Sequence, residues 1–217
     1  YFFERVVELE TKKSISSEKT MLDTLNALAL ARDNETGNHI IRTQKYVNKL
    51  ALRLSGFKHY SETLNAQTIS LLTKAASLHD VGKVGIPDSI LLKTSKLTDE
   101  EWDVMKTHTT IGENVLTSVD VESHNKNNVL SFAIEIAGGH HEKWDGSGYP
   151  RGLKGSEIPL SARIMSLADM YDALLSERVY KESWSHDDAV REIQSRSGTH
   201  FDPEIVDAFV AEIEAFK

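Results

Sequence analysis

Apolar side chains recur every three or four residues along most of this chain, and no segment alternates apolar and polar residues over the length of a strand. The first spacing puts apolar groups on one face of an α-helix, whereas strict alternation is typical of a half-buried strand. We therefore predict an all-α fold. Helices are expected at 38–55, 66–80, 98–106, 109–118, 128–142, 159–176, 186–197 and 203–216.

Residues that favour helix starts support three of these boundaries. Thr98 and Glu101 have the spacing of a capping box, in which each side chain accepts a hydrogen bond from the other residue's backbone N–H. Ser185 and the pair Asp202-Pro203 predict the starts of the last two helices, because serine and aspartate cap helices and proline suits the first helical position.

Residues 1–31 contain no glycine or proline and predict one long helix with a polar middle, TKKSISSEKT. Such a helix cannot easily bury its first half on a compact domain. We therefore expect a helical linker or coiled-coil stalk from an upstream module, which also favours a homodimer. A simple packed N-terminal helix is the alternative.

The chain has 217 residues and a formal net charge of −8, which argues against binding to DNA or RNA polymers because that binding requires a basic surface. An anionic substrate would then need a local source of positive charge, such as metal ions. The absence of cysteine excludes thiolate ligands and is typical of a reducing, cytoplasmic compartment. No run approaches the ~20 apolar residues of a membrane helix, and the acidic start YFFERVVELE predicts no signal peptide.

Histidines and carboxylates that could bind metal ions lie at several points along the chain. Two of them are four residues apart at a helix start, and two pairs of neighbours each precede a turn, where adjacent side chains can meet one ion. A single histidine or aspartate in a helix is more often an ordinary surface or hydrogen-bonded group. The candidates are Glu35, His39, His79, Asp80, His108, His140, His141 and Asp169.

Imidazole and carboxylate ligands suit iron, manganese and zinc, and ligand type alone does not choose among them. Two such ions about 3.5–4 Å apart can lower the pKa of a bridging water and clamp the oxygens of a phosphodiester. These residue types are therefore compatible with metal-assisted phosphodiester hydrolysis. The other four histidines, His59, His124, His186 and His200, are assigned to the ordinary class.

The stretches LHDVGKVGIPDSIL and HHEKWDGSGYPRGLKGSEIPLSARI resemble the HD-GYP family of phosphodiesterases. The similarity continues in ARDNETGNH, MKTHTTIGENVL, ADMYDALLSERVYK and GTHFDPEIVDAF, and covers about 20–217. It implies a helical HD-superfamily domain over that range, overlapping the linker at 1–31. It also implies hydrolysis of the bacterial second messenger cyclic di-GMP to linear pGpG, with or without further cleavage to GMP.

The resemblance further implies that the eight candidate residues hold two or three divalent metal ions, commonly iron and sometimes manganese. Glu35 is the residue that makes a third ion feasible. Asp80 is expected to bridge two ions, and a hydroxide between them to attack phosphorus. Lys83 follows Asp80 by three residues and would contact the substrate phosphate, so Asp80 and Lys83 are the candidate catalytic residues.

Further candidates surround this set. Tyr149, in the loop DGSGYPRG, could stack on a guanine or simply fix the loop by packing. Arg178 and Lys181 resemble phosphate-binding residues of the family, and surface ion pairing is their ordinary alternative. Asp33 and Asp172 are candidates to orient a ligand or a partner side chain, such as Arg32 for Asp33 or Arg178 for Asp172.

Other functions stay open at this point. The chain could be a module that senses a nucleotide, or docks proteins through the GYP loop, without turnover; the intact ligand set argues against this. A hydrolase of nucleoside triphosphates or guanosine alarmones is disfavoured by the GYP loop and the paired histidines. Cyclic GMP-AMP is an alternative substrate. An upstream receiver or sensory domain is the expected source of control.

Overall fold

The computed structural model describes residues 20, 22, 24, 27, 37–119, 128–176 and 183–216. These residues form helices and connecting turns with no strand, so the predicted all-α fold is confirmed. Short 3₁₀ turns lie at Ala76–Leu78, Val81–Gly85, Gly155–Glu157 and Ile213–Phe216. The α-helices are α2 (Gly37–Ser55), α3 (Ala66–Ala75), α4 (Asp88–Leu91), α5 (Asp99–Lys106), α6 (His108–Val119), α7 (Val129–Gly139), α8 (Leu160–Leu175), α9 (His186–Ser195) and α10 (Pro203–Ala211).

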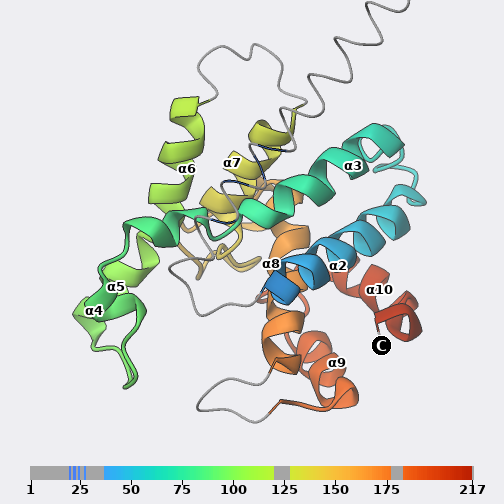
Figure 1. Cartoon of the computed structure of the whole chain (residues 1–217). Helices are drawn as coiled ribbons and strands as arrows, with labels where there is room; N and C mark the ends of the chain where they lie inside the picture. The colour runs from blue at the N-terminus through green and yellow to red at the C-terminus, as the bar shows by residue number, and fades with distance from the viewer. Residues whose placement is uncertain are drawn as a thin grey trace, which may run out of the picture.

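Helices α2, α3, α7 and α8 lie together at the centre of the molecule (Figure 1). Helix α2 packs against α3, α8 and α10, while α7 packs against α3, α6 and α8. Helices α4, α5 and α6 lie on one side of this centre, and α9 and α10 lie at the opposite end (Figure 1).

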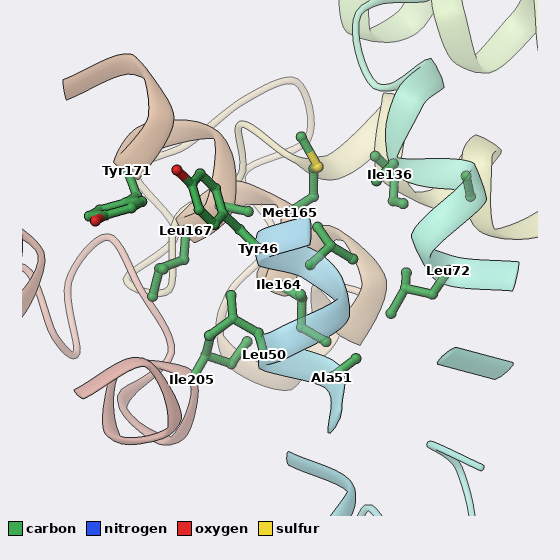
Figure 2. Close-up of a cluster of buried hydrophobic side chains, with 14 of the residues drawn as sticks. Tyr46, Leu50, Ala51, Leu72, Ile136, Ile164, Met165, Leu167, Tyr171 and Ile205 are labelled. Atoms are coloured by element: carbon green, nitrogen blue, oxygen red, sulfur yellow. The ribbon is translucent and has the colours of Figure 1, made fainter. Parts of the chain in front are cut away.

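The hydrophobic core fills the space between the central helices. Figure 2 shows side chains from α2, α3, α7, α8 and α10 meeting there. Leu50 of α2 and Ile164 of α8 are completely buried, as is Ile136 of α7. Burying a side chain of this size stabilises a fold by roughly 1.5–3 kcal/mol. The core therefore fixes α2, α7 and α8, the helices that carry or directly precede much of the site described below.

The capping residues are confirmed where the sequence predicted them. Thr98 and Glu101 form the complete capping box at the start of α5. The side chain of Ser185 accepts from the N–H of Asp188 at the start of α9, and Asp202 caps α10 with Pro203 in its first turn.

Three predicted helices are shorter than expected: α10 stops at Ala211 rather than residue 216, and the other two end at a candidate ligand pair. Helix α3 stops at Ala75 rather than residue 80, and the chain continues in 3₁₀ turns around His79 and Asp80. Helix α7 stops at Gly139 rather than residue 142, because the chain turns there with the N–H of Glu142 donating to the carbonyl of Gly139. The short helix α4 was not predicted.

The predicted N-terminal linker at 1–31 lies almost wholly outside the described residues. Its described members, Thr20, Leu22, Thr24 and Ala27, are helical. Leu22 is 7% exposed and belongs to the core cluster. The division of the chain at residue 31 stays a prediction. No helix within the described ranges has both the length and the apolar character needed to cross a membrane.

The loop after α7 is joined to the turn after α9 by backbone hydrogen bonds. Trp144 donates to the carbonyl of His200 and Asp145 to that of Thr199, at 3.0 and 2.9 Å. The His200 ring stacks on Phe201, and its Nδ1 is buried with no hydrogen-bond partner. Burial, reinforced by the nearby charges of Lys143 and Arg196, lowers the pKa of His200 to about 4.

We expect His200 to make the fold sensitive to mild acid. Its pKa in the unfolded chain is about 6.5, so between pH 6.5 and 4 only the unfolded state binds the proton, and stability falls as pH falls. At pH 5 this costs about 2 kcal/mol. Urea unfolding at pH 7 and pH 5 should therefore show a smaller loss of stability for His200→Gln than for the native chain. Equal losses would contradict this.

Candidate metal centre

Seven of the eight predicted metal ligands converge into two adjacent groups. One group comprises Asp80, His108, His140 and His141, and the other comprises His39, His79 and Asp169. Within each group every residue offers one ligand atom, and these atoms lie within 4.8 Å of one another. The eighth candidate, Glu35, lies outside the described residues, as does Asp33.

Five separate segments supply these side chains. His39 lies at the start of α2, Asp169 in α8, and the His79-Asp80 pair in the turn after α3. His108 is the first residue of α6, and the pair at 140–141 follows α7. The ends of several helices and the interior of α8 therefore meet at one place.

Three of the histidines are oriented by their own helical turns. Their Nδ1 atoms donate to backbone carbonyls, that of His79 to Ala76 at 3.0 Å, that of His108 to Met105 at 2.8 Å and that of His140 to Ile136 at 2.9 Å. A neutral imidazole that donates through Nδ1 keeps a lone pair on Nε2. Each Nε2 is thus prepared to bind a cation, which is the usual arrangement of a metal-binding histidine.

Asp80 lies between the two groups. Its Oδ1 is 3.3 Å from Nε2 of His108 and 3.7 Å from Nε2 of His140, while its Oδ2 is 3.2 Å from Nε2 of His79. The Oδ1 atom of Asp80 and the Nε2 atoms of His108 and His140 are buried without a hydrogen-bond partner. Buried polar atoms without partners are costly and rare. Three such atoms facing one another fit a shared divalent cation.

The second group has three members. Nε2 of His39 lies 3.4 Å from Nε2 of His79, and Oδ1 of Asp169 lies 3.7 and 3.9 Å from these two nitrogens. The lone pairs of these two nitrogens and the carboxylate oxygen of Asp169 therefore point toward the same place, where all three can act as electron-pair donors. This donor set also fits a divalent cation.

Electrostatics keep the donors in their metal-binding protonation states. Burial opposes ionisation of Asp80, but the charge of Lys83 and the neighbouring imidazole of His79 outweigh it and hold the pKa of this carboxyl well below its usual range. Nζ of Lys83 lies 2.8 Å from Oδ2 of Asp80. Burial lowers the pKa values of His108 and His141, so both imidazoles are neutral near pH 7.

The GYP loop, residues 146–153, contacts the first group. The Tyr149 ring stacks on His141 with centroids 4.8 Å apart and planes 26° apart. Burial raises the pKa of Tyr149, and the charges of Asp80 and Asp169 raise it further, so the hydroxyl stays protonated. The Tyr149-Pro150 peptide bond is cis. Arg178 and Lys181 lie outside the described residues.

Asp172 orients His39 from the side opposite the metal-binding nitrogen. Its Oδ2 accepts from Nδ1 of His39 at 2.8 Å, and its two oxygens accept from Nε and Nη2 of Arg42 at 2.6 and 2.8 Å. Burial opposes ionisation of Asp172, but Arg42 and His39 outweigh it and lower its pKa. Arg42 was not predicted, although its position three residues after His39 on one helix face is a signal that could have identified it.

The remaining histidines belong to neither group, as predicted for the three that are described. His59 pairs with Glu204, His186 contacts the Tyr171 hydroxyl, and His200 packs on Phe201. His124 lies outside the described residues.

Comparison with known proteins places this site in a family context. A sequence profile of the HD domain family matches residues 35–205. A Vibrio cholerae protein named cyclic di-GMP phosphodiesterase is 57% identical over 194 residues, covering 89% of this chain and 39% of that protein. Another V. cholerae protein, named 3'3'-cGAMP-specific phosphodiesterase 2, is 39% identical over 201 residues. That match covers 93% of this chain and 36% of that protein.

A solved structure of a cyclic GMP-AMP specific phosphodiesterase from V. cholerae superimposes with a TM-score of 0.63. The match covers 90% of this chain and 49% of that one, at 20% identity, so it concerns the fold alone. The chain spans less than half the length of the two curated relatives described above.

Proposed function

This chain belongs to the HD-GYP family of HD-domain proteins, and from that premise we propose that it is a metal-dependent phosphodiesterase. The proposed reaction is hydrolysis of cyclic di-GMP to linear pGpG, with or without further cleavage to GMP. The observation that carries the proposal is the position of Asp80, whose two oxygens face two separate groups of nitrogen ligands. The name of the 57% identical relative supports the choice of substrate.

We infer that the first group holds one divalent ion and the second group another, with Asp80 shared between them. A third ion would need Glu35. Bound ions of this kind activate water and neutralise charge on a phosphodiester. Iron is the proposed metal and manganese the alternative, since imidazole and carboxylate suit both. The ions would also provide the positive charge that a chain of net charge −8 needs in order to bind an anion.

The chain's own residues would bind and orient the substrate. Nζ of Lys83 lies beside the centre and would contact a phosphate oxygen and stabilise charge that develops there. The Tyr149 ring, which stacks on His141, offers an aromatic face on which a guanine can stack. Arg178 and Lys181 would bind further phosphate oxygens, and Asp33 would orient a ligand.

The Asp172–Arg42 pair is expected to control metal affinity through His39. Replacing Asp172 by Asn puts an amide donor within reach of the Nδ1–H of His39 and weakens the pairing with Arg42. Loss of such a partner typically lowers metal affinity 10–100-fold. Calorimetric titration with Mn²⁺ should show this drop, while Asp207→Asn, an exposed carboxylate on α10, should leave the affinity unchanged. Equal affinities of the two variants would contradict the proposed role.

The direct test of the proposed function is incubation of metal-loaded protein, prepared without oxygen, with cyclic di-GMP, followed by chromatography of the nucleotides. Appearance of pGpG or GMP is expected. Binding without product would instead favour a nucleotide-sensing or protein-docking module. Cyclic GMP-AMP belongs in the same assay, because the 39% identical relative is named for that substrate. Elemental analysis of the same protein identifies the metal.

The setting of the domain in a longer protein is also a proposal. An upstream receiver or sensory domain, dimerisation through the N-terminal helix, protein partners at the GYP loop and a cytoplasmic location fit a signalling phosphodiesterase. The molecular mass of the full-length protein in solution tests the dimer.

A further inference from the structure

Glu142 directly follows the two histidines of the first group, and its carboxylate is buried. The residue is 1% exposed, and no lysine or arginine side chain pairs with the carboxylate within the described residues. Its Oε1 accepts from the backbone N–H of Arg151 at 2.7 Å, and its Oε2 accepts from that of Leu153 at 3.0 Å. A buried carboxylate is costly unless its lone pairs are used, so these two bonds are a substantial constraint on the loop.

Other contacts draw the same loop toward the end of α7. The N–H of Tyr149 donates to the carbonyl of His141 at 3.2 Å. A Cβ on Gly148 would lie 2.5 Å from Cα of Glu142, so the two backbones touch where only glycine fits. On the outer side, the guanidinium of Arg151 donates to the carboxylate of Glu113 and to the carbonyl of Gly138.

These contacts connect Glu142 to the aromatic face proposed for substrate binding. Glu142 accepts a hydrogen bond from the N–H of Arg151, which lies two residues after Tyr149. The Tyr149 ring stacks on His141, the residue before Glu142. The carboxylate of Glu142 therefore fixes the backbone that follows Tyr149, and this backbone in turn limits where the Tyr149 side chain can lie. Motion of residues 151–153 away from Glu142 would move the tyrosine ring off His141.

We propose that Glu142 is a positioning residue that holds the GYP loop on the metal centre and sets the place of the Tyr149 ring for the nucleotide. The part of this inference that concerns the nucleotide rests on the proposed function. Glu142 itself does not touch the substrate. Its removal should weaken substrate binding and leave the metal ligands in place, because the Nδ1 atom of His140 is held by the carbonyl of Ile136 in α7 and not by the loop.

Hydrogen exchange tests the attachment of the loop without any nucleotide. Glu142→Gln keeps the size of the side chain but replaces one acceptor oxygen by an NH₂ group, so one of the two amides at 151 and 153 loses its partner. We expect exchange in the peptide spanning 148–155 to become about tenfold faster, the loss of one charge-assisted hydrogen bond. Glu157→Gln is the matched control, because exposed Glu157 accepts only the N–H of Lys154 and glutamine can keep that bond.

Steady-state kinetics test the link to the substrate. Glu142→Gln should raise KM for cyclic di-GMP about tenfold, with kcat within about threefold and an unchanged number of metal ions per chain. In a Tyr149→Ala background the same substitution should change KM by less than about threefold, because the ring that it positions is absent. An equal rise in KM in both backgrounds, or loss of metal from Glu142→Gln, overturns the inference.

A second variant keeps the test decisive if Glu142→Gln does not fold. Arg151→Gln removes the exposed guanidinium contacts to Glu113 and Gly138 and should raise KM in the same direction, again only when Tyr149 is present. If the native chain does not hydrolyse the nucleotide while Glu142→Gln still accelerates exchange, the proposed function fails and the loop attachment stands. If the native chain hydrolyses the nucleotide but Glu142→Gln leaves hydrogen exchange at 148–155 unchanged, this inference fails and the proposed function stands.

Discussion

Replacing Asp80 by asparagine is expected to lower kcat roughly a thousandfold, about 4 kcal/mol of transition-state stabilisation. Asparagine keeps the shape of the side chain but offers one oxygen instead of two. Its NH₂ group must then face either His79 or the pair of His108 and His140, whose Nε2 atoms lie within 3.2 to 3.7 Å of the carboxylate oxygens. One of the two groups thus loses an anionic ligand and gains a donor in its place.

The measurement pairs single-turnover kinetics with metal analysis. Asp80→Asn should hold fewer ions per chain than the native protein, and excess Mn²⁺ should restore little activity. Asp187→Asn, an exposed carboxylate on α9, is the matched control and should retain full activity. An Asp80→Asn protein with a full set of ions and more than a tenth of native turnover would show that the aspartate does not join the two groups.

Much of the helical architecture could be predicted because it depends on local spacing. The apolar stripe of α2, including Leu50, and the capping residues Thr98 and Ser185 act over a few residues, so the sequence displays them directly. The premature ends of α3 and α7 do not follow from spacing. They arise from tertiary contacts, since the chain turns where the pairs His79-Asp80 and His140-His141 meet residues of distant segments.

The seven candidate ligands that come together in the structure could be predicted from the sequence because residue type limits metal chemistry and the family resemblance gives the order of the motifs. Spacing alone did not reveal that Asp80 has one oxygen toward each group, which depends on how five segments meet. Glu142 was missed for a different reason. A glutamate next to a loop is usually solvated, and only the fold shows that this one is buried against the N–H groups of Arg151 and Leu153.

Gly82 explains how the turn carrying Asp80 and Lys83 can lie so close to the helix carrying His108. The 3₁₀ turn Val81–Gly85 packs on α6, and Gly82 faces Gly112 across the contact. A Cβ built on Gly82 would lie 1.9 Å from the carbonyl oxygen of His108 and 2.4 Å from the backbone nitrogen of Gly112. Both neighbours are backbone atoms, so neither can move aside by a change of rotamer.

Gly82→Ala is therefore expected to force the turn away from α6 and to destabilise the protein by at least about 3 kcal/mol, the upper end of the cost of overpacking. The same displacement separates Asp80 from His108, so metal affinity should fall together with stability. Gly85→Ala is the matched control in the same turn, because the three atoms nearest to a Cβ there belong to the side chain of Ile111 and not to the backbone, at 3.0 Å or more. Urea unfolding and Mn²⁺ titration of both variants measure the two effects. If Gly82→Ala matched Gly85→Ala in both measurements, close backbone contact at this glycine would not be what brings the two ligands together.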